Sequence, residues 1–317
     1  MKRSWLKYLK DPVGESRLHL KKAKLTINNN EIISGVLATA SGKTYEILEG
    51  IPVLLTRTTQ SLKSVESFAY EWEQFGFLFA KENWLNHLIK PLVGSDSFFK
   101  NRVVVDAGAG SGAQSRWMVE AGAKFVFSLE LSNSTHTIHA NTIKEYKDKI
   151  FPIQCDIAHP PLRIRPDVIY CVNVIQHTKS PLKTLLSLAQ LMGDKTVFIF
   201  NMYDRNKNST KRLILIKSVR FITRFLPFFV WKWLTFFYIS LLYLLVKIPI
   251  VSTVTHRLYP IGTSFRGDWL NLYDLGGAHY YQDFYSRGEQ RKLIKEAGLK
   301  IKKQTRFGYV LIRTKGN

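Results

Sequence analysis

A glycine-rich loop is the part of the sequence best suited to chemistry. It reads Val103-Val-Val-Asp106-Ala-Gly108-Ala-Gly110-Ser-Gly112. The three valines predict a buried strand that ends in a carboxylate, and the glycines allow the backbone to turn sharply beneath a ligand. Loops of this kind, where a strand runs into a helix, bind nucleotide-containing ligands, although a tight strand-to-helix turn gives the same pattern. The loop therefore predicts a nucleotide site that includes Asp106, Gly108, Gly110 and Gly112.

Carboxylates follow the next two predicted strands at their carboxyl ends. Glu130 lies about 20 residues after the glycines, where an acidic side chain accepts hydrogen bonds from both ribose hydroxyls. Asp156 follows the third strand and offers an acceptor for an adenine amino group, and the apolar Ile157 beside it can cover the ring. Taken alone, Asp156 could equally be a solvated helix cap. Because open α/β sheets bind ligands at the carboxyl ends of their strands, we expect these side chains at one edge.

The charge of the loop favours one cofactor over another. Dinucleotide-binding loops follow the pattern G-x-G-x-x-G, in which a helix N-terminus receives a pyrophosphate. This loop reads D-x-G-x-G-x-G instead, and its leading Asp106 would repel a pyrophosphate. A carboxylate in that position suits the cationic methionyl portion of S-adenosylmethionine. We therefore expect S-adenosylmethionine as the cofactor.

Strand and helix patterns alternate around these residues. They are predicted at Arg102–Val105, Ala113–Ala121, Phe125–Glu130, Ser134–Tyr146, Ile150–Cys155, Asp167–Val172, Pro181–Met192 and Thr196–Asn201. Strands separated by helices indicate parallel βαβ units with right-handed crossovers. A helix over Arg287–Ala297 and an antiparallel pair, Leu299–Gln304 with Tyr309–Arg313, are expected to close the sheet. The predicted fold class is α/β, a doubly wound, Rossmann-like sheet.

The segment from Val103 to Tyr203 resembles the class I S-adenosylmethionine-dependent methyltransferases. The loop, Glu130, Asp156-Ile157 and Asn173-Val-Ile-Gln-His177 fall at that family's successive motifs. The tail, from Tyr273-Asp274 through Tyr281 to Gly298-Leu299, is similar to the closing part of small-molecule methyltransferases in the same superfamily. The resemblance implies these contacts: Gly108 and Gly110 under the methionyl and ribose parts, Glu130 on the ribose, Asp156 and Ile157 on adenine, and Asn173 near the methionyl end.

Methyl transfer from a sulfonium is a direct displacement, so the protein chiefly aligns the nucleophile with the methyl group and excludes water. If the acceptor is a hydroxyl, a base helps, and His177 after the fourth strand is the candidate. The alternative is a histidine that caps the following helix or packs against the cofactor loop. Weaker candidates for acceptor contacts are Tyr203, Asp274, His279 and Tyr280.

Residues 1–58 predict a small β-rich module, with turns at Asn28–Asn30 and Ser41-Gly42. This part resembles the zinc-ribbon-type module found fused to, or partnered with, some bacterial methyltransferases. The pattern Gly50-Ile-Pro-Val-Leu-Leu after Gly42-Lys-Thr-Tyr45 carries the resemblance. That module's paired cysteines would fall at Asp11, Gly14, Ala38 and Ser41, so we expect no thiolate zinc site, and we name no metal ligand elsewhere. One or two helices between Val65 and Val93, with Phe68 and Trp72 at helical spacing, lead into the main domain.

A basic and apolar insert interrupts the domain at residues 205–263. Residues 205–257 hold ten basic and no acidic residues, interleaved with the most apolar part of the chain, Phe225–Val254. The longest uncharged run, Trp233–Val246, has 14 residues, short of the roughly 20 needed to cross a bilayer. Two interpretations remain. The insert is a helical lid over the active site, or its aromatic residues enter a headgroup layer while Lys and Arg meet anionic lipid. The aromatic residues concerned are Trp231, Trp233, Phe236, Phe237 and Tyr238.

The composition indicates the compartment and the kind of partner. Lys and Arg number 46 against 24 Asp and Glu, a net charge of +22, which favours nucleic acid, a membrane surface or a phosphorylated substrate. Solubility alone is the other explanation of this charge. The only cysteines, Cys155 and Cys171, exclude a disulfide framework and fit a reducing cytoplasm. No apolar run follows the basic start, so we expect no secretory signal. The expected location is the cytoplasm, at the inner face of the membrane if the insert binds lipid.

The predicted organisation is the module at 1–58, the methyltransferase domain at 59–204 and 264–317, and the insert at 205–263. A small-molecule or lipid-like acceptor ranks first. A tRNA substrate ranks below it, because the charge is concentrated in an apolar segment and the sequence carries no usual RNA-binding motif. The non-enzymatic alternative is a scaffold that binds S-adenosylmethionine without turnover. The acceptor atom and the oligomeric state stay open.

Overall fold

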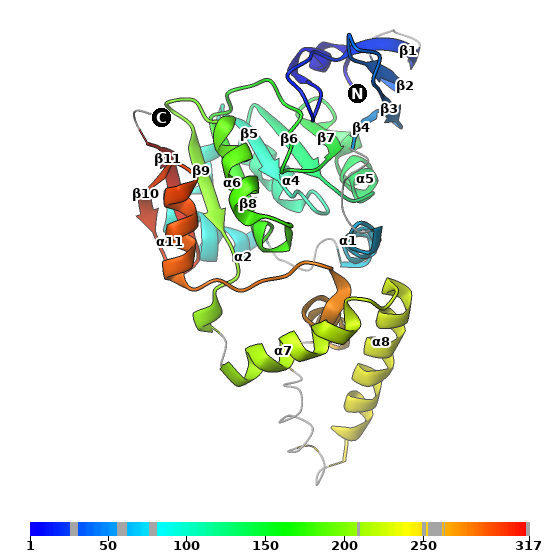
Figure 1. The fold of residues 1–317 in the computed structure, drawn as a ribbon, viewed down its shortest axis with the longest axis vertical. Coiled ribbons are helices and arrows are strands. Elements are labelled where there is room, and N and C mark those ends of the chain that lie inside the picture. The colour runs from blue at the N-terminus through cyan, green and yellow to red at the C-terminus, as the bar shows by residue number, and fades with distance from the viewer. Residues whose placement is uncertain are drawn as a thin grey trace.

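The computed structural model describes residues 1–25, 31–55, 62–75, 81–207, 210–248, 252, 262 and 264–314. Within them the strands form one eleven-stranded sheet, in the order β1-β2-β3-β4-β7-β6-β5-β8-β9-β11-β10 (Figure 1). The turn predicted at Asn28–Asn30 and the part of the insert at 253–261 lie outside the described residues.

The centre of the sheet is parallel and has the predicted strands. These are β7 (Ile150–Cys155), β6 (Phe125–Glu130), β5 (Val103–Ala107), β8 (Val168–Val172) and β9 (Val197–Asn201). The predicted closing pair is confirmed as well: β11 (Tyr309–Arg313) lies antiparallel to β9, and β10 (Leu299–Gln304) lies antiparallel to β11. β5 has β6 on one side and β8 on the other, so the strand order reverses at β5, which is where such sheets bind ligands.

Helices cover both faces of this sheet. They are α4 (Ala113–Glu120), α5 (Thr135–Tyr146), α6 (Pro181–Gln190) and α11 (Arg287–Glu296). Alternate residues of one strand belong to different cores: Val105 packs in one hydrophobic cluster and Val104 in the other, because successive side chains of a strand point to opposite faces. Local signals set two of the helix starts. Ser180 caps α6, and a capping box of Ser286 with Glu289 starts α11. The doubly wound fold is confirmed.

The N-terminal strands extend the same sheet. After a short 3-10 helix, η1 (Arg3–Tyr8), the strands β1 (His19–Leu25), β2 (Ile32–Ala38), β3 (Thr44–Leu48) and β4 (Ile51–Leu54) form an antiparallel meander. β4 then pairs in parallel with β7, and the Trp5 ring packs 4.4 Å from the Phe151 ring of β7. The β-rich prediction is therefore confirmed, and this segment shares its core with the main domain.

The carboxylate of Asp11 links the loop after η1 to the β-rich segment. Its carboxylate Oδ1 accepts hydrogen bonds from the Tyr45 hydroxyl at 2.6 Å, from Lys43 Nζ at 3.3 Å and from the Val13 backbone at 3.1 Å. Tyr45 is buried. A network of hydrogen bonds thus ties the loop after η1 to β3.

Asp11→Ala is expected to lower the free energy of unfolding by about 1–3 kcal/mol, because the buried Tyr45 hydroxyl loses its acceptor. Urea unfolding at neutral pH measures the change. Asp11→Asn keeps a carbonyl acceptor for Tyr45 and serves as the matched control, with a smaller loss. Equal stability of the wild type and the alanine variant would contradict this account of the network.

Further helical segments come before the glycine loop and after β9, and those between Lys81 and Phe99 pack on one face of the sheet. α1 (Leu62–Phe75), α2 (Lys81–Trp84), the π turn η2 (Leu85–Ile89) and α3 (Lys90–Val93) confirm the helices predicted between Val65 and Val93, and the short η3 (Asp96–Phe99) follows. The insert begins after η5 (Arg205–Lys207) and contains α7 (Thr210–Thr223) and α8 (Phe228–Leu245). It is followed by α10 (Phe265–Tyr273) and the π turn η6 (Asp274–Ala278). Figure 1 shows α7 and α8 in the lower part of the view, on the far side of α1 from the N-terminal strands.

Candidate active site

A pocket lies at the carboxyl edge of the sheet, where β5, β6, β7 and β8 end. Its lining comes from those strand ends, from the 3-10 turn η4 (Ile175–His177) and from α1. The lining residues are Phe68, Trp72, Gly108, Glu130, Leu131, Asp156, Ile157, Asn173, Val174, His177 and Thr178. The structure thus brings most of the residues singled out in the sequence into one pocket. Asp106, Gly110 and Gly112 are not part of this lining and lie behind it.

The three loop glycines are required by conformation and by space. Gly108, Gly110 and Gly112 have φ angles of +85°, +57° and +83°, in the left-handed region that favours glycine. A Cβ on Gly108 would stand 2.5 Å from the Val174 side chain, and one on Gly110 would stand 2.7 Å from the Trp72 ring. The missing side chain of Gly108 therefore allows Val174 to pack against the loop, and that of Gly110 allows the Trp72 ring of α1 to do the same.

Glu130 fastens the loop to the end of β6. Its Oε2 accepts a hydrogen bond from the Gly110 backbone at 2.9 Å, and its Oε1 accepts from the backbone and the hydroxyl of Ser132, both at 2.9 Å. Burial raises the pKa of Glu130, and the N–H groups of Ser132 and Gly110 oppose that shift. The carboxylate is therefore held in a fixed position at the edge of the pocket.

Asp106 faces away from the pocket. The Ser115 hydroxyl of α4 donates to its carboxylate at 2.5 Å, and Ser115 lies 2.7 Å from the Ser128 hydroxyl. Residues two apart in a strand share a face, so Asp106 points to the same side as Val104, which packs near α4. Burial, together with the nearby charge of Glu130, raises the pKa of Asp106 to about 7. The charge of Asp106 predicts a place at the cationic end of the cofactor, but its carboxylate lies beneath the loop, against Ser115.

The remaining predicted cofactor residues line the pocket from β7 and β8. Asp156 accepts a hydrogen bond from the Ala158 backbone at 2.8 Å, so it caps a turn and lines the pocket at once. Ile157 is buried beside it. Asn173 has a φ of +59°, and its backbone N–H donates to the Asn201 side chain at 3.1 Å.

Two aromatic residues of α1 form the wall that sequence reasoning did not assign to the site. Phe68 and Trp72 lie four residues apart and so share one face of the helix. The Phe68 ring stacks on the His279 ring, with centroids 3.7 Å apart, and meets the His177 ring edge-on at 5.5 Å. Their spacing could have indicated a common face, but it gave no indication that this face covers the glycine loop.

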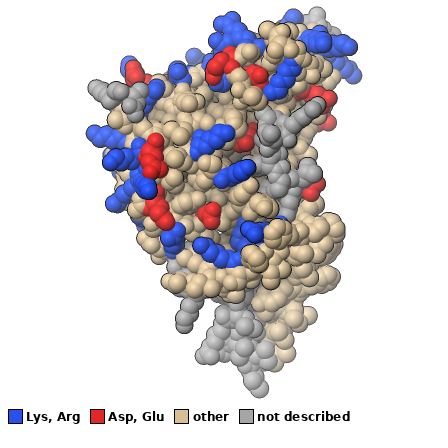
Figure 2. Space-filling model, in the orientation of Figure 1, with Lys and Arg blue, Asp and Glu red and all other residues tan. Residues whose placement is uncertain are grey.

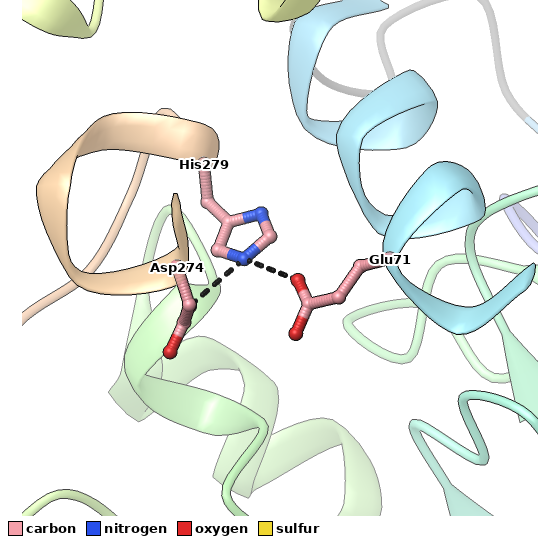
Figure 3. A group of neighbouring side chains, drawn as sticks. All are labelled: Glu71, Asp274 and His279. Carbon is pink, nitrogen blue, oxygen red and sulfur yellow. Dashed lines mark ion pairs between the residues drawn. The ribbon is translucent and has the colours of Figure 1, made fainter. Parts of the chain in front are cut away.

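A buried polar cluster adjoins the pocket on the side of the insert. His279 Nε2 lies 3.0 Å from Glu71 Oε2 of α1 and 3.0 Å from Asp274 Oδ1 of η6 (Figure 3). The Tyr203 hydroxyl donates to Asp274 Oδ2 at 3.4 Å. From α7, Arg220 donates to the His279 carbonyl at 2.6 Å. Three of the weaker sequence candidates, Tyr203, Asp274 and His279, are thus neighbours, while the ring contact of Tyr280 is with Tyr281.

His177 joins the pocket to this cluster. Its ring centroid lies 5.2 Å from that of His279 and 5.4 Å from that of Tyr203, and its Nδ1 lies 3.2 Å from the Tyr281 carbonyl. Burial, reinforced by His279, lowers the pKa of His177 to about 3. Burial also opposes the charged form of His279, but Asp274 and Glu71 outweigh it and raise its pKa. The surroundings therefore favour the neutral form of His177, whereas the two carboxylates favour the protonated form of His279.

A larger open cleft lies elsewhere, between the N-terminal segment and the loop before β8. Its lining includes Lys10, Arg163, Arg165 and Arg313. None of the residues that the sequence assigned to the cofactor or to catalysis borders this cleft, so the smaller pocket at the strand ends is the candidate active site.

Comparison with known proteins gives a family for part of the chain. Residues 80–235 match a family model described as a methyltransferase domain. Among curated relatives, the histone-arginine methyltransferase CARMER of Drosophila ananassae is 27% identical over 118 residues, which cover 34% of this chain and 22% of the relative. The chain thus spans about a fifth of the length of the curated relatives it matches.

Solved structures are similar at low identity. The pyocyanin biosynthetic protein PhzM has a TM-score of 0.47 and 15% identity, over 79% of this chain and 62% of that chain. A structure of a Haloferax volcanii complex that contains the Trm112 methyltransferase activator has a TM-score of 0.46 and 14% identity, over 79% of this chain and 81% of that chain. The family match starts at residue 80, so the zinc-ribbon resemblance of residues 1–58 finds no support in it.

The pocket suits the cofactor expected from the sequence. Glu130 offers a fixed carboxylate, Asp156 offers a second acceptor, and Gly108 lines the pocket between them without a side chain. β5, at which the strand order reverses, lies within the residues that match the family model. Residues 80–235 therefore form a class I methyltransferase domain, the type whose methyl donor is S-adenosylmethionine.

Proposed function

We propose that this chain transfers a methyl group from S-adenosylmethionine to a small-molecule or lipid-like acceptor. The acceptor would bind between the pocket and the polar cluster of Glu71, Tyr203, Asp274 and His279. The observation that carries the proposal is the position of His177, which lines the pocket and lies 5.2 Å, ring to ring, from His279. Groups able to hydrogen-bond an acceptor thus adjoin the place where a methyl donor fits.

S-adenosylmethionine, when bound, supplies an electrophilic methyl group on its sulfonium. The chain's own residues bind and orient it. Glu130 accepts hydrogen bonds from the ribose hydroxyls, Asp156 accepts one from the adenine amino group, Ile157 covers the ring, and Asn173 lies at the methionyl end. Because the reaction is a direct displacement, holding the two reacting atoms in line supplies most of the acceleration. Phe68 and Trp72 cover the pocket and exclude water.

His177 would position the acceptor. A pKa of about 3 leaves its ring neutral at physiological pH and makes it a weak base. If Nδ1 carries the proton and donates to the Tyr281 carbonyl, Nε2 is the nitrogen that accepts a hydrogen bond from a hydroxyl. In this role His177 aligns the acceptor oxygen and does not need to be protonated during the reaction.

The exposed face of the insert supports a lipid-like acceptor. Large apolar side chains of α7, α8 and the residues flanking them are solvent-exposed: Ile214, Leu215, Phe221, Ile222, Phe225, Phe229, Trp233, Leu234, Phe237, Tyr238, Leu241, Leu244 and Ile248. In Figure 2 the lower right of the molecule, where α8 lies, shows mainly uncharged residues. Exposed Arg212, Lys217 and Lys247 accompany this surface. A contiguous apolar surface beside basic residues is typical of a helix lying in a membrane interface.

Among the described residues, α8 is the one helix long and apolar enough to cross a bilayer, by length and composition alone. It has 18 residues and a mean hydropathy of 1.6. Its other face, however, packs on the domain: Trp231 is buried and its Nε1 donates to the Tyr273 carbonyl at 2.9 Å. Because one side of α8 packs on the domain, we propose that the helix lies on the membrane surface and does not cross the bilayer. The protein would then be located at the inner, cytoplasmic face.

Flotation with anionic liposomes tests this surface. We expect wild-type protein to rise with the vesicles and Trp233→Glu/Phe237→Glu to stay behind, because two carboxylates replace apolar side chains at the headgroup boundary. Leu186→Glu on α6 is the matched control, since Leu186 is an exposed apolar residue on a different helix, and it should float like the wild type. Wild-type protein that stays in the soluble fraction would remove the membrane part of the proposal.

Turnover itself is tested by two measurements. Calorimetric titration with S-adenosylmethionine should show saturable binding, and mass spectrometry of metabolites and lipids from cells with and without the protein should show a species lighter by one CH₂ when the protein is absent. Binding without any methylated product would favour the scaffold alternative. A methylated tRNA, or a methylated protein such as the names of the curated relatives suggest, would instead reassign the acceptor.

A further inference from the structure

The three side chains of Glu71, Asp274 and His279 come from two separate parts of the chain and converge on one point. Glu71 belongs to α1, before the glycine loop, whereas Asp274 and His279 belong to η6 and the residue after it, beyond the insert. One ligand atom from each lies within 4.8 Å of the others. Figure 3 shows the Nε2 edge of the His279 ring facing the gap between the two carboxylates.

The contacts are close without being aligned hydrogen bonds. His279 Nε2 lies 3.0 Å from each carboxylate oxygen, yet within the described residues Glu71 Oε2 and both ring nitrogens of His279 have no hydrogen-bond partner of acceptable angle. His279 is 1% exposed and Glu71 is 8% exposed, so both side chains are shielded from bulk solvent. Buried polar atoms of this kind require a partner, and the ring nitrogen is directed between the oxygens rather than at either one.

Two of the three separations match those of ligands around a metal ion. Ligands about 2.1 Å from a divalent cation, at right angles to each other, are about 3.0 Å apart, which is the separation of Nε2 from each oxygen. Two carboxylates and one imidazole are a ligand set for Mn²⁺, Fe²⁺ or Zn²⁺. A divalent charge would also offset the cost of burying two carboxylates that face each other.

We propose that Glu71, Asp274 and His279 bind a divalent transition-metal cation next to the cofactor pocket. Three protein ligands leave coordination positions open, as in catalytic metal sites. The role of the cation in the reaction rests on the proposed methyl transfer, whereas its binding does not. An acceptor hydroxyl that coordinates the cation becomes more acidic and releases its proton to solvent. Its oxygen then forms the bond to the methyl carbon while the carbon–sulfur bond breaks and sulfur keeps the electron pair.

With a cation at this site, an oxygen nucleophile is the acceptor that the cation would activate without a strong protein base. Phe68 links the two sites, because its ring stacks on His279 and also lines the cofactor pocket. The sequence analysis named no metal ligand. Glu71 lies 203 residues before Asp274 in the chain, and nothing in the sequence indicates that they meet.

Mn²⁺ binding to the full-length, tag-free protein tests the site. After treatment with chelator and dialysis, titration followed by electron paramagnetic resonance should show about one Mn²⁺ bound per chain, because bound Mn²⁺ loses the sharp spectrum of the free ion. His279→Gln and Glu71→Gln should each weaken binding at least about tenfold. His136→Gln is the matched control: His136 also pairs with a glutamate, Glu49, at 3.0 Å, but at the surface, and its loss should leave binding unchanged.

Circular dichroism checks that each variant is folded. If a variant does not fold, Mn²⁺ binding to the wild type still tests the proposal by itself. Mn²⁺ or Zn²⁺ should raise the Tm of the wild type and of His136→Gln. No saturable binding to the wild type, or equal binding by folded His279→Gln, would overturn the proposal and leave the three residues as a buried ion-pair cluster. Calorimetry with S-adenosylmethionine in the presence of chelator separates the two proposals, since the cofactor should bind whether or not the cation does.

Discussion

Gly110→Ala is expected to weaken S-adenosylmethionine binding more than about 30-fold. The residue has a φ of +57°, a conformation that costs a residue with a Cβ roughly 1–2 kcal/mol. The added methyl group would also stand 2.7 Å from the Trp72 ring. Relief of that overlap moves either α1 or the loop, and the loop carries the N–H that holds Glu130. Since every 1.4 kcal/mol is a factor of ten in affinity, the two effects together account for the expected loss.

Isothermal titration calorimetry measures this loss, and the chain offers a matched control. Gly42 also has a positive φ, +85°, but a Cβ there would meet nothing within 4 Å. Gly42→Ala therefore introduces the same backbone strain without the contact, and it should bind the cofactor like the wild type. If the affinity of Gly110→Ala for S-adenosylmethionine were within about threefold of that of the wild type, the contact of Trp72 with this glycine would not matter for cofactor binding.

Residues close together in the sequence gave the most reliable predictions. The run of valines before Asp106 and the alternating segments after it are local patterns, and the strands and helices of the central sheet lie where these patterns predict them. The pocket followed for the same reason. Glu130, Asp156 and Asn173 come at the ends of consecutive parallel strands, and the topology of such a sheet brings those ends together.

The features that sequence reasoning missed depend on the path of the chain between distant segments. α1 covers the glycine loop because the Trp72 ring fits closely over Gly110. The helical spacing of Phe68 and Trp72 shows that they share a face, but it does not show what that face packs against. The meeting of Glu71 with His279 depends on how the insert returns to the domain. The direction of the Asp106 side chain follows from strand alternation, which places it on the same face as Val104. Its negative charge alone suggested contact with the cofactor instead.

The insert connects the membrane hypothesis to the active site. Arg220 of α7 donates to the His279 carbonyl, and Trp231 of α8 donates to the Tyr273 carbonyl next to Asp274. The same two helices expose apolar side chains on their other sides. A helix pair that lies against a membrane would therefore also hold the segment that carries Asp274 and His279. On this hypothesis an amphiphilic acceptor reaches the pocket along the surface proposed to lie on the membrane.

Asp106→Asn is expected to make the stability of the protein less dependent on pH. Burial raises the pKa of Asp106 to about 7, so between about pH 4 and pH 7 the folded state holds a proton that the unfolded state releases. The free energy of unfolding therefore falls as pH rises through this window. A shift of about three pH units corresponds to about 4 kcal/mol at most. Asparagine cannot ionise, and its carbonyl oxygen still accepts the hydrogen bond from Ser115.

Urea unfolding of the wild type and of Asp106→Asn at pH 5 and pH 8 measures the difference. The variant should gain stability relative to the wild type between the two values, by up to about 3 kcal/mol, while Asp194→Asn, at an exposed position, should follow the wild type. The same variant also tests the direct contact with the cofactor that the sequence suggested. Because the carboxylate lies behind the loop, affinity for S-adenosylmethionine at pH 6 should change less than tenfold, and a larger loss would restore Asp106 to the cofactor site.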